Sequence, residues 1–173
     1  MQSLKNTDRS NTCCFIGDGN QNKIFLFDEK APYYKEIKSK IEKNVVCLIE
    51  NFSVTNFMSG MDIGFEQCAA EIVLEQKQKY PAITLEGVLP FENHSVNWTW
   101  AQRNKYYSIM EKSDKEILLQ YHYTDNCMSL RNQYMINNSK YIIFFQCETS
   151  NLDNLILYAK SKKRVVLIID SGV

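Results

Sequence analysis

The sequence predicts an α/β fold, a single Rossmann-like, doubly wound and mainly parallel sheet flanked by helices. Two observations support this prediction. Short apolar runs that are typical of strands alternate with helical patterns of roughly ten to twenty residues, which favours right-handed crossovers between parallel strands. The most apolar run, YIIFFQC at 141–147, lacks the alternation of a half-exposed strand, so both of its faces are expected to be covered.

The predicted elements cover the chain in order. Residues 1–11 are polar and are expected to form a frayed tail, which leaves 12–173 as one domain. The segment 24–27 fits either a strand fragment or a flap against the core. Strands are predicted at 12–16, 54–58, 84–89, 116–121, 141–147 and 165–170. Helices are predicted at 32–51, 64–79, 97–112, 126–139 and 151–162.

Spacing and end signals justify the helices. The helix at 32–51 repeats apolar residues every three or four positions, and Pro32 lies near its first turn, where a missing N–H costs nothing. Pro81 ends the helix that begins at Gly64. Ser150 is expected to cap the last helix.

The helix at 97–112 carries several large rings. Its predicted apolar face consists of Trp100, Tyr107 and Met110. At least two of four aromatic residues are expected in the core, and one remains a candidate for stacking on a base: Trp98, Trp100, Tyr106 and Tyr107.

Composition and charge restrict the function classes. The 173 residues are 45% hydrophobic and 23% charged, as in globular domains, and the net charge is zero. A neutral chain argues against non-specific nucleic-acid binding and against a polybasic membrane patch. No apolar run approaches the roughly 20 residues of a membrane-spanning helix, and no signal-peptide core is present, so a cytoplasmic protein is expected.

Cysteine and histidine are not spaced for metal binding. The six cysteines are scattered without a CxxC pair, so buried free thiols are expected rather than disulfides or zinc ligands. The only histidines, His94 and His122, fall in predicted loops and are expected to be solvated. No metal site is therefore predicted.

The stretch 54–79 is the clearest candidate for a ligand site. A strand stops at Ser59-Gly60 and a helix begins at Gly64, which aims backbone N–H groups and the positive helix end above the strand. This favours a phosphate or carboxylate, although an ordinary tight connection has the same pattern. In a doubly wound sheet the turns after the strands meet at one edge, where ligands bind. The residues predicted to contact a ligand at that edge are Gly17, Asp18, Ser59, Gly60, Met61, Pro90, Phe91, Glu92 and Thr149.

Three charged residues near this edge have open roles. Arg131, one turn into a helix between apolar neighbours, is either an exposed charge, which the pattern alone favours, or a bidentate phosphate clamp. Glu66 fits a carboxylate stabilising a helix N-terminus better than a general base. Glu92, just after a strand, is suited to accept hydrogen bonds from ribose hydroxyls. Glu92 and Glu66 are the candidate catalytic acids or bases.

Four segments are characteristic of a known family: CCFIGDGN, SGMDIGFEQCAAEIVL, LPFENHSVNWTWAQRNKYYSIM and CMSLRNQYM. In this order they resemble the YpsA-like proteins of the SLOG superfamily, Rossmann-like bacterial proteins related to the LOG phosphoribohydrolases and to the DNA-processing protein DprA. The resemblance covers residues 13–170. It implies a nucleotide-type ligand over the strand ends, with a nucleotide, an ADP-ribose-type compound or NAD as candidates, and no defined reaction.

Two loops depart from the relatives' pattern. Their first turn commonly reads Thr-Gly-His-Arg-Pro, whereas this chain has IGDGN at 16–20, which weakens an anion site there. LOG enzymes carry a Gly-Gly-x-Gly-Thr-x-x-Glu loop where residues 147–154 have no glycine to let the backbone approach a phosphate. The catalytic glutamate of LOG enzymes falls on Asn154, and Asn132 replaces the lysine of their Arg-Lys pair, of which Arg131 remains. LOG-type hydrolysis is therefore not expected.

Three hypotheses follow. The leading one is a sensor or regulator that binds a nucleotide or nucleotide-derived ligand at this edge, with Arg131 and Asn132 among the contacts. The second is a nucleotide-processing enzyme, an N-glycosidic hydrolase or transferase, that uses Glu92 or Glu66. The third is a protein-interaction module whose pocket is degenerate and filled by Glu148 or a tyrosine. A homodimer and a protein partner both stay open.

Overall fold

The computed structural model describes residues 9–18, 27–147 and 151–171. Its strands are β1 (Thr12–Ile16), β2 (Asn56–Ser59), β3 (Thr84–Leu89), β4 (Lys115–Leu118), β5 (Tyr141–Gln146) and β6 (Val165–Asp170). Its α-helices are α1 (Tyr34–Phe52), α2 (Phe65–Gln76), α3 (Trp100–Met110), α4 (Cys127–Asn137) and α5 (Asp153–Ser161).

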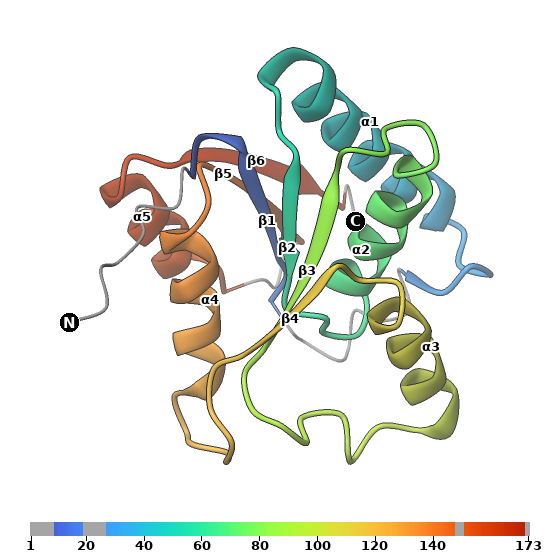
Figure 1. Ribbon diagram of the computed structural model, residues 1–173, viewed down its shortest axis with the longest axis vertical. Coiled ribbons are helices and arrows are strands. Elements are labelled where there is room, and N and C mark those ends of the chain that lie inside the picture. The colour runs from blue at the N-terminus through green and yellow to red at the C-terminus, as the bar shows by residue number, and fades with distance from the viewer. Residues whose placement is uncertain (1–8, 19–26, 148–150, 172–173) are drawn as a thin grey trace.

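The six strands form one parallel sheet in the order β4-β3-β2-β1-β5-β6. The chain builds outward from β1 to β4 and then returns to place β5 on the other side of β1, so the strand order reverses between β1 and β5. Helices α1, α2 and α3 cover one face of the sheet, and α4 and α5 cover the other (Figure 1). The predicted doubly wound α/β fold is confirmed.

The interior strands supply both layers of the core. Phe15 and Ile143 pack into the cluster beneath α1 and α2, whereas Ile16 and Ile142 pack into the cluster beneath α4 and α5. Successive side chains of a strand point to opposite faces. The prediction that the run at 141–147 is covered on both faces is confirmed, because Tyr141–Phe145 are all buried.

Helix α3 corrects the predicted apolar face. Trp100 and Tyr107 are 74% and 55% exposed, while Tyr106 and Ile109 are buried. The helix begins one residue after Thr99, whose side chain accepts the Gln102 N–H in a capping box. This start directs Trp100 to solvent, and the earlier ring of Trp98 packs edge-on against Tyr106 at 5.6 Å instead. Trp98 and Tyr106 are thus the two rings that join the core.

Several element ends differ from the predicted ones. Helix α5 has Leu152 at its N-cap position, so Asp153 opens the helix, and Ser150 lies outside the described residues. Strand β4 ends at Leu118, three residues before the predicted end. Of the expected tail, Arg9–Asn11 forms a short 3-10 helix. Phe27, the last residue of the segment expected as a strand fragment or a flap, is buried against Phe145. Residues 24–26 lie outside the described ranges.

The state of the cysteines agrees with the expectation of free thiols from the sequence. All six cysteines are free, and five of them are buried, with Cys47 exposed. None of the helices in the described ranges is both long enough and apolar enough to span a membrane.

Candidate functional site

The turn between β2 and α2 is held by its own hydrogen bonds. Ser59 is fully buried, and its hydroxyl donates to the backbone carbonyl of Glu66 at 2.9 Å and accepts the Met61 N–H at 3.2 Å. Met61 adopts a left-handed backbone with φ 62°, and Gly64 has φ 101°. Non-glycine residues in that region cost free energy and concentrate where a structure needs a particular turn. Ser59 is therefore committed to the turn rather than directed at a ligand.

A buried ion cluster lies on the α4 side of this turn. Arg131 is 1% exposed, its Nη1 lies 3.0 Å from Asp62 Oδ2, and its Nη2 lies 3.5 Å from Glu66 Oε1. The same Nη1 donates to the Gly60 carbonyl at 3.3 Å. Asn132 Oδ1 accepts from Arg131 Nε and Nη2 at 3.2 and 2.9 Å. The pattern-based expectation of an exposed Arg131 is wrong, because two acids and a carbonyl compensate the buried guanidinium.

Gly60 is the residue that lets this cluster form. A Cβ at position 60 would lie 2.6 Å from Arg131 Cζ and Nε and 2.6 Å from Glu66 Oε2. Those distances are well inside van der Waals contact, so any side chain there would displace the ion pair. The expectation that Gly60 and Arg131 lie together at one edge of the sheet is confirmed.

Glu66 lies deeper than a typical helix-start carboxylate. It is 1% exposed and accepts backbone N–H groups from Gly17 and Asp62, both at 3.2 Å. Burial raises the pKa of Glu66 to about 7, and the nearby Asp62 adds to the rise while Arg131 opposes it. A raised carboxyl pKa is common at functional sites, but this carboxylate has no exposed surface from which to reach a substrate.

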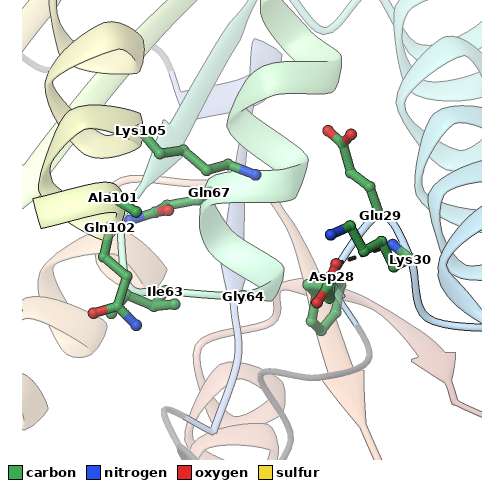
Figure 2. Close-up of a pocket in the computed structure, with 10 residues that line it drawn as sticks. Asp28, Glu29, Lys30, Ile63, Gly64, Gln67, Ala101, Gln102 and Lys105 are labelled. Carbon is green, nitrogen blue, oxygen red and sulfur yellow. Dashed lines mark hydrogen bonds between the residues drawn. The ribbon is translucent and has the colours of Figure 1, made fainter. Parts of the chain in front are cut away.

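A cavity of about 690 Å³ lies on the other side of the turn, between the start of α2, helix α3 and residues 27–30. Figure 2 shows Gly64 at the start of α2, with Lys105 of α3 on one side and Asp28, Glu29 and Lys30 on the other. Lys105 also pairs with Glu71 at 2.9 Å. The wall includes Phe27, Ile63, Gln67, Ala101 and Gln102. The volume falls within the range that holds small ligands.

The loop after β3 carries an aromatic cluster around His94. The imidazole packs edge-on against Trp98 and Tyr106, each at 5.1 Å, and against Phe91 at 6.2 Å. Both ring nitrogens are buried and have no hydrogen-bond partner among the described residues. Burial lowers the pKa of His94 to about 4. The expectation of a solvated His94 is wrong, whereas His122 is exposed as expected.

The predicted contacts separate into two groups. Gly17, Gly60, Glu66, Arg131 and Asn132 form one connected cluster, with Ser59 and Met61 in the turn above. Pro90 is buried, Phe91 is half-buried and Glu92 is exposed, all after β3. Asp18 is half-buried after β1, and Thr149 lies outside the described residues.

Sequence reasoning missed Asp62, the buried ring nitrogens of the half-buried His94 and the residues of the cavity wall. Asp62 follows the predicted turn directly, so its position beside Gly60 was the available signal for it. Within the described ranges, no three His, Cys, Asp or Glu side chains are grouped to hold a metal ion.

Comparison with family models decides what kind of protein this is. The YpsA model, described as the YspA SLOG family, matches residues 19–165. The chain belongs to this SLOG family. The SLOG family resemblance drawn from the four sequence segments is confirmed, and the matched range includes the turn, the ion cluster and α3 of the cavity wall.

Bacterial relatives in this SLOG family share about a quarter to a third of the aligned residues with the chain. UPF0398 protein SUB1405 of Streptococcus uberis is 31% identical over 137 residues, covering 78% of this chain and 77% of that protein. UPF0398 protein BH1768 of Halalkalibacterium halodurans is 32% identical over 118 residues, covering 67% of this chain and 61% of that protein. UPF0398 protein YpsA of Bacillus subtilis is 24% identical over 144 residues, covering 82% of this chain and 78% of that protein.

Two solved structures share the SLOG fold. DNA processing protein A from Helicobacter pylori superposes with a TM-score of 0.57 at 14% identity, over 93% of this chain and 66% of that chain. DNA processing protein A (DprA) from Streptococcus pneumoniae superposes with a TM-score of 0.56 at 14% identity, over 91% of this chain and 49% of that chain. At this identity the likeness establishes the fold alone.

Proposed function

We propose that this protein binds a nucleotide or a nucleotide-derived compound at the carboxyl edge of its sheet and acts as a sensor or regulator. The observation that carries the proposal is the cavity of about 690 Å³ beside the start of α2. In open α/β sheets ligands bind beyond the carboxyl ends of the strands, and a helix start there favours an anionic group.

The cavity wall has both kinds of surface that a nucleotide needs. Phe27, Ile63 and Ala101 offer apolar contact for a base. Lys30 and Lys105 offer positive charge for a phosphate, in a wall that also carries Asp28 and Glu29. Lys105 pairs with Glu71, but this pair is partly exposed and opens at less cost than a buried pair. This assignment differs from the expected site at Arg131. That guanidinium is already compensated by Asp62 and Glu66, so an added phosphate would have to compete with two internal carboxylates.

A panel of nucleotides, ADP-ribose forms and NAD, followed by thermal unfolding and calorimetry, tests the proposal. At 100 times its dissociation constant a true ligand adds about 2.7 kcal/mol to the free energy of unfolding. Ala101→Trp places a large side chain in the cavity and should reduce the shift. Ser108→Trp, on the same helix but lining a different hollow, should retain it. No shift with wild type, or an equal shift with Ala101→Trp, would refute the proposal.

A second candidate is binding of single-stranded DNA, which DNA processing protein A from Helicobacter pylori binds. The observation in its favour is a pair of exposed rings on α3, Trp100 and Tyr107, with Arg103 between them in the sequence. Exposed aromatic rings stack on bases regardless of sequence. The argument from zero net charge against non-specific nucleic-acid binding is therefore open to question.

Fluorescence anisotropy with labelled oligo(dT) and a matched duplex separates the two candidates. DNA binding predicts saturable binding of the single strand that weakens with salt and is lost in Trp100→Ala, because the stacking surface is removed. Ala101→Trp should leave that binding unchanged. Absence of single-strand binding at low salt would eliminate this candidate and leave the nucleotide proposal unaffected.

A further inference from the structure

Strand β6 forms an apolar edge of the sheet. It lies at one end of the strand order, so one of its sides has no neighbouring strand among the described elements. No side chain from 165 to 169 is charged, and Val165 and Ile168 are 42% and 50% exposed. The opposite edge strand, β4, is shorter and begins with the exposed Lys115 and Glu116. Charges and short length keep edge strands from pairing with other chains, and β6 has neither protection over this run.

The outward backbone groups of β6 belong to Val166 and Ile168. The Val165 N–H donates to the Lys140 carbonyl on the β5 side at 2.9 Å. Successive residues of a strand direct their backbone groups to opposite sides, so Val166 and Ile168 direct theirs away from the sheet. Neither residue uses these groups in a hydrogen bond with the part of the chain that the structure describes.

The next outward groups in both directions are already bonded. The Arg164 N–H donates to the Ala159 carbonyl at 3.0 Å, and the Asp170 carbonyl accepts from Lys40 Nζ at 3.3 Å. A second β6 can therefore add without breaking these bonds in one antiparallel register, with Val166 opposite Ile168 of the partner subunit. The two-fold axis then passes at Leu167, and a shift by one residue would put the side chains on the wrong faces.

Charge along this edge favours a second copy in the antiparallel orientation. The exposed Lys162 and Lys163 precede β6, and the exposed Asp170 ends it. Helix α5 packs on β6 and runs in the opposite direction, with Asp153 in its first turn and Lys160 in its last. The acids thus lie at one end of the edge and the bases at the other. A two-fold axis brings the basic end of each copy to the acidic end of the other, whereas parallel pairing would bring like charges together.

We propose that this protein forms a homodimer in which the β6 strands of two copies pair antiparallel about Leu167 and join the two sheets into one. Pairing buries the exposed Ile168 against Val166 of the partner subunit and bonds the outward backbone groups of both strands. None of the residues that carry this proposal lines the cavity, so it stands independently of the ligand proposed above.

Disulfide trapping of the full chain tests the pairing and its register. All variants carry Cys47→Ser, which removes the exposed thiol. Leu167→Cys faces itself across the axis in a non-hydrogen-bonded pair, where the Cα atoms lie about 4.5 Å apart, within reach of a disulfide. We expect mild oxidation to give a covalent dimer. Val165→Cys is the matched control, because the two copies of residue 165 are separated by about 13 Å along the strands and should stay uncrosslinked.

Sedimentation equilibrium measures the dimer without crosslinking. Ile168→Asp should weaken it at least about tenfold, because the symmetry introduces the desolvated carboxylate twice. Val96→Asp, which changes a 59% exposed apolar residue after β3, should leave the dimer unchanged. Circular dichroism establishes that both variants are folded.

Three outcomes would overturn the proposal. One is a wild-type chain that stays monomeric, which is also the outcome if β6 pairs only with a different protein. The second is equal weakening by Ile168→Asp and Val96→Asp. The third is crosslinking of Val165→Cys as readily as Leu167→Cys.

Discussion

Replacing Gly60 with alanine perturbs the one contact that sequence reasoning predicted across the sheet edge. The new Cβ would meet Arg131 Cζ and Nε and Glu66 Oε2 at 2.6 Å, so the buried ion pair must separate or shift. Breaking a buried pair costs about 3–5 kcal/mol, and overpacking costs about 1–3 kcal/mol. Reduced chain entropy in the unfolded state returns roughly 0.4–1 kcal/mol. Together these terms predict a net loss of at least about 3 kcal/mol.

Urea unfolding followed by circular dichroism measures this loss, with Gly87→Ala as the matched control. A Cβ at Gly87 would also be crowded, but by Met110 Sδ and Cε at 2.7 and 2.8 Å, the far end of a flexible side chain. Gly87→Ala should therefore cost clearly less, with an unchanged m value in both variants. Equal losses for the two variants would show that packing volume, rather than the ion pair, decides the result.

Three further predictions concern buried groups. The pKa of Glu66 is about 7 in the folded protein, above its usual 4.5, so its contribution to stability is full below pH 4.5 and is lost as the pH rises through 7. The pKa of His94 is lowered from 6.5 to about 4, so its contribution is full above pH 6.5 and is lost as the pH falls through 4. Relative to wild type, His94→Phe should therefore gain about 2 kcal/mol of stability from pH 7 to pH 5. Over the same range Glu66→Gln should lose about 2 kcal/mol relative to wild type. Parallel pH profiles would contradict both assignments. Tyr106→Ala should cost about 3–5 kcal/mol and Tyr107→Ala under about 1 kcal/mol in the same urea assay, because only the first ring is buried. A thiol reagent should modify Cys47 quickly and the five buried cysteines only on unfolding, and fast modification of two or more thiols would contradict the described burial.

The sheet was predictable because its signals are local and repeated. The uninterrupted apolar run of β5 indicated a strand covered on both faces, and the turn from Ser59 to Gly64 indicated a strand that leads directly into a helix. The edge at which the strands end then placed Gly60 beside Arg131 without any contact information.

The environments of single side chains were not predictable from the same patterns. The neighbours of Arg131 are all apolar or neutral along its own helix, and the acids that bury it come from residues 62 and 66 of a distant segment. His94 sits in a polar stretch of sequence, yet rings from Trp98 and Tyr106 enclose it once α3 begins at its capping box. In both cases tertiary contacts, rather than local periodicity, determine the exposure.

The central claim is that the cavity beside the start of α2 receives a nucleotide-type ligand. Backbone amide NMR during titration with the compound that gives the largest thermal shift tests this claim most directly. We predict saturable shifts concentrated at Ile63, Gly64, Gln67 and Ala101, which line the cavity. Shifts confined to the outer face of α3 around Trp100 and Tyr107, or no saturable shifts at all, would contradict it.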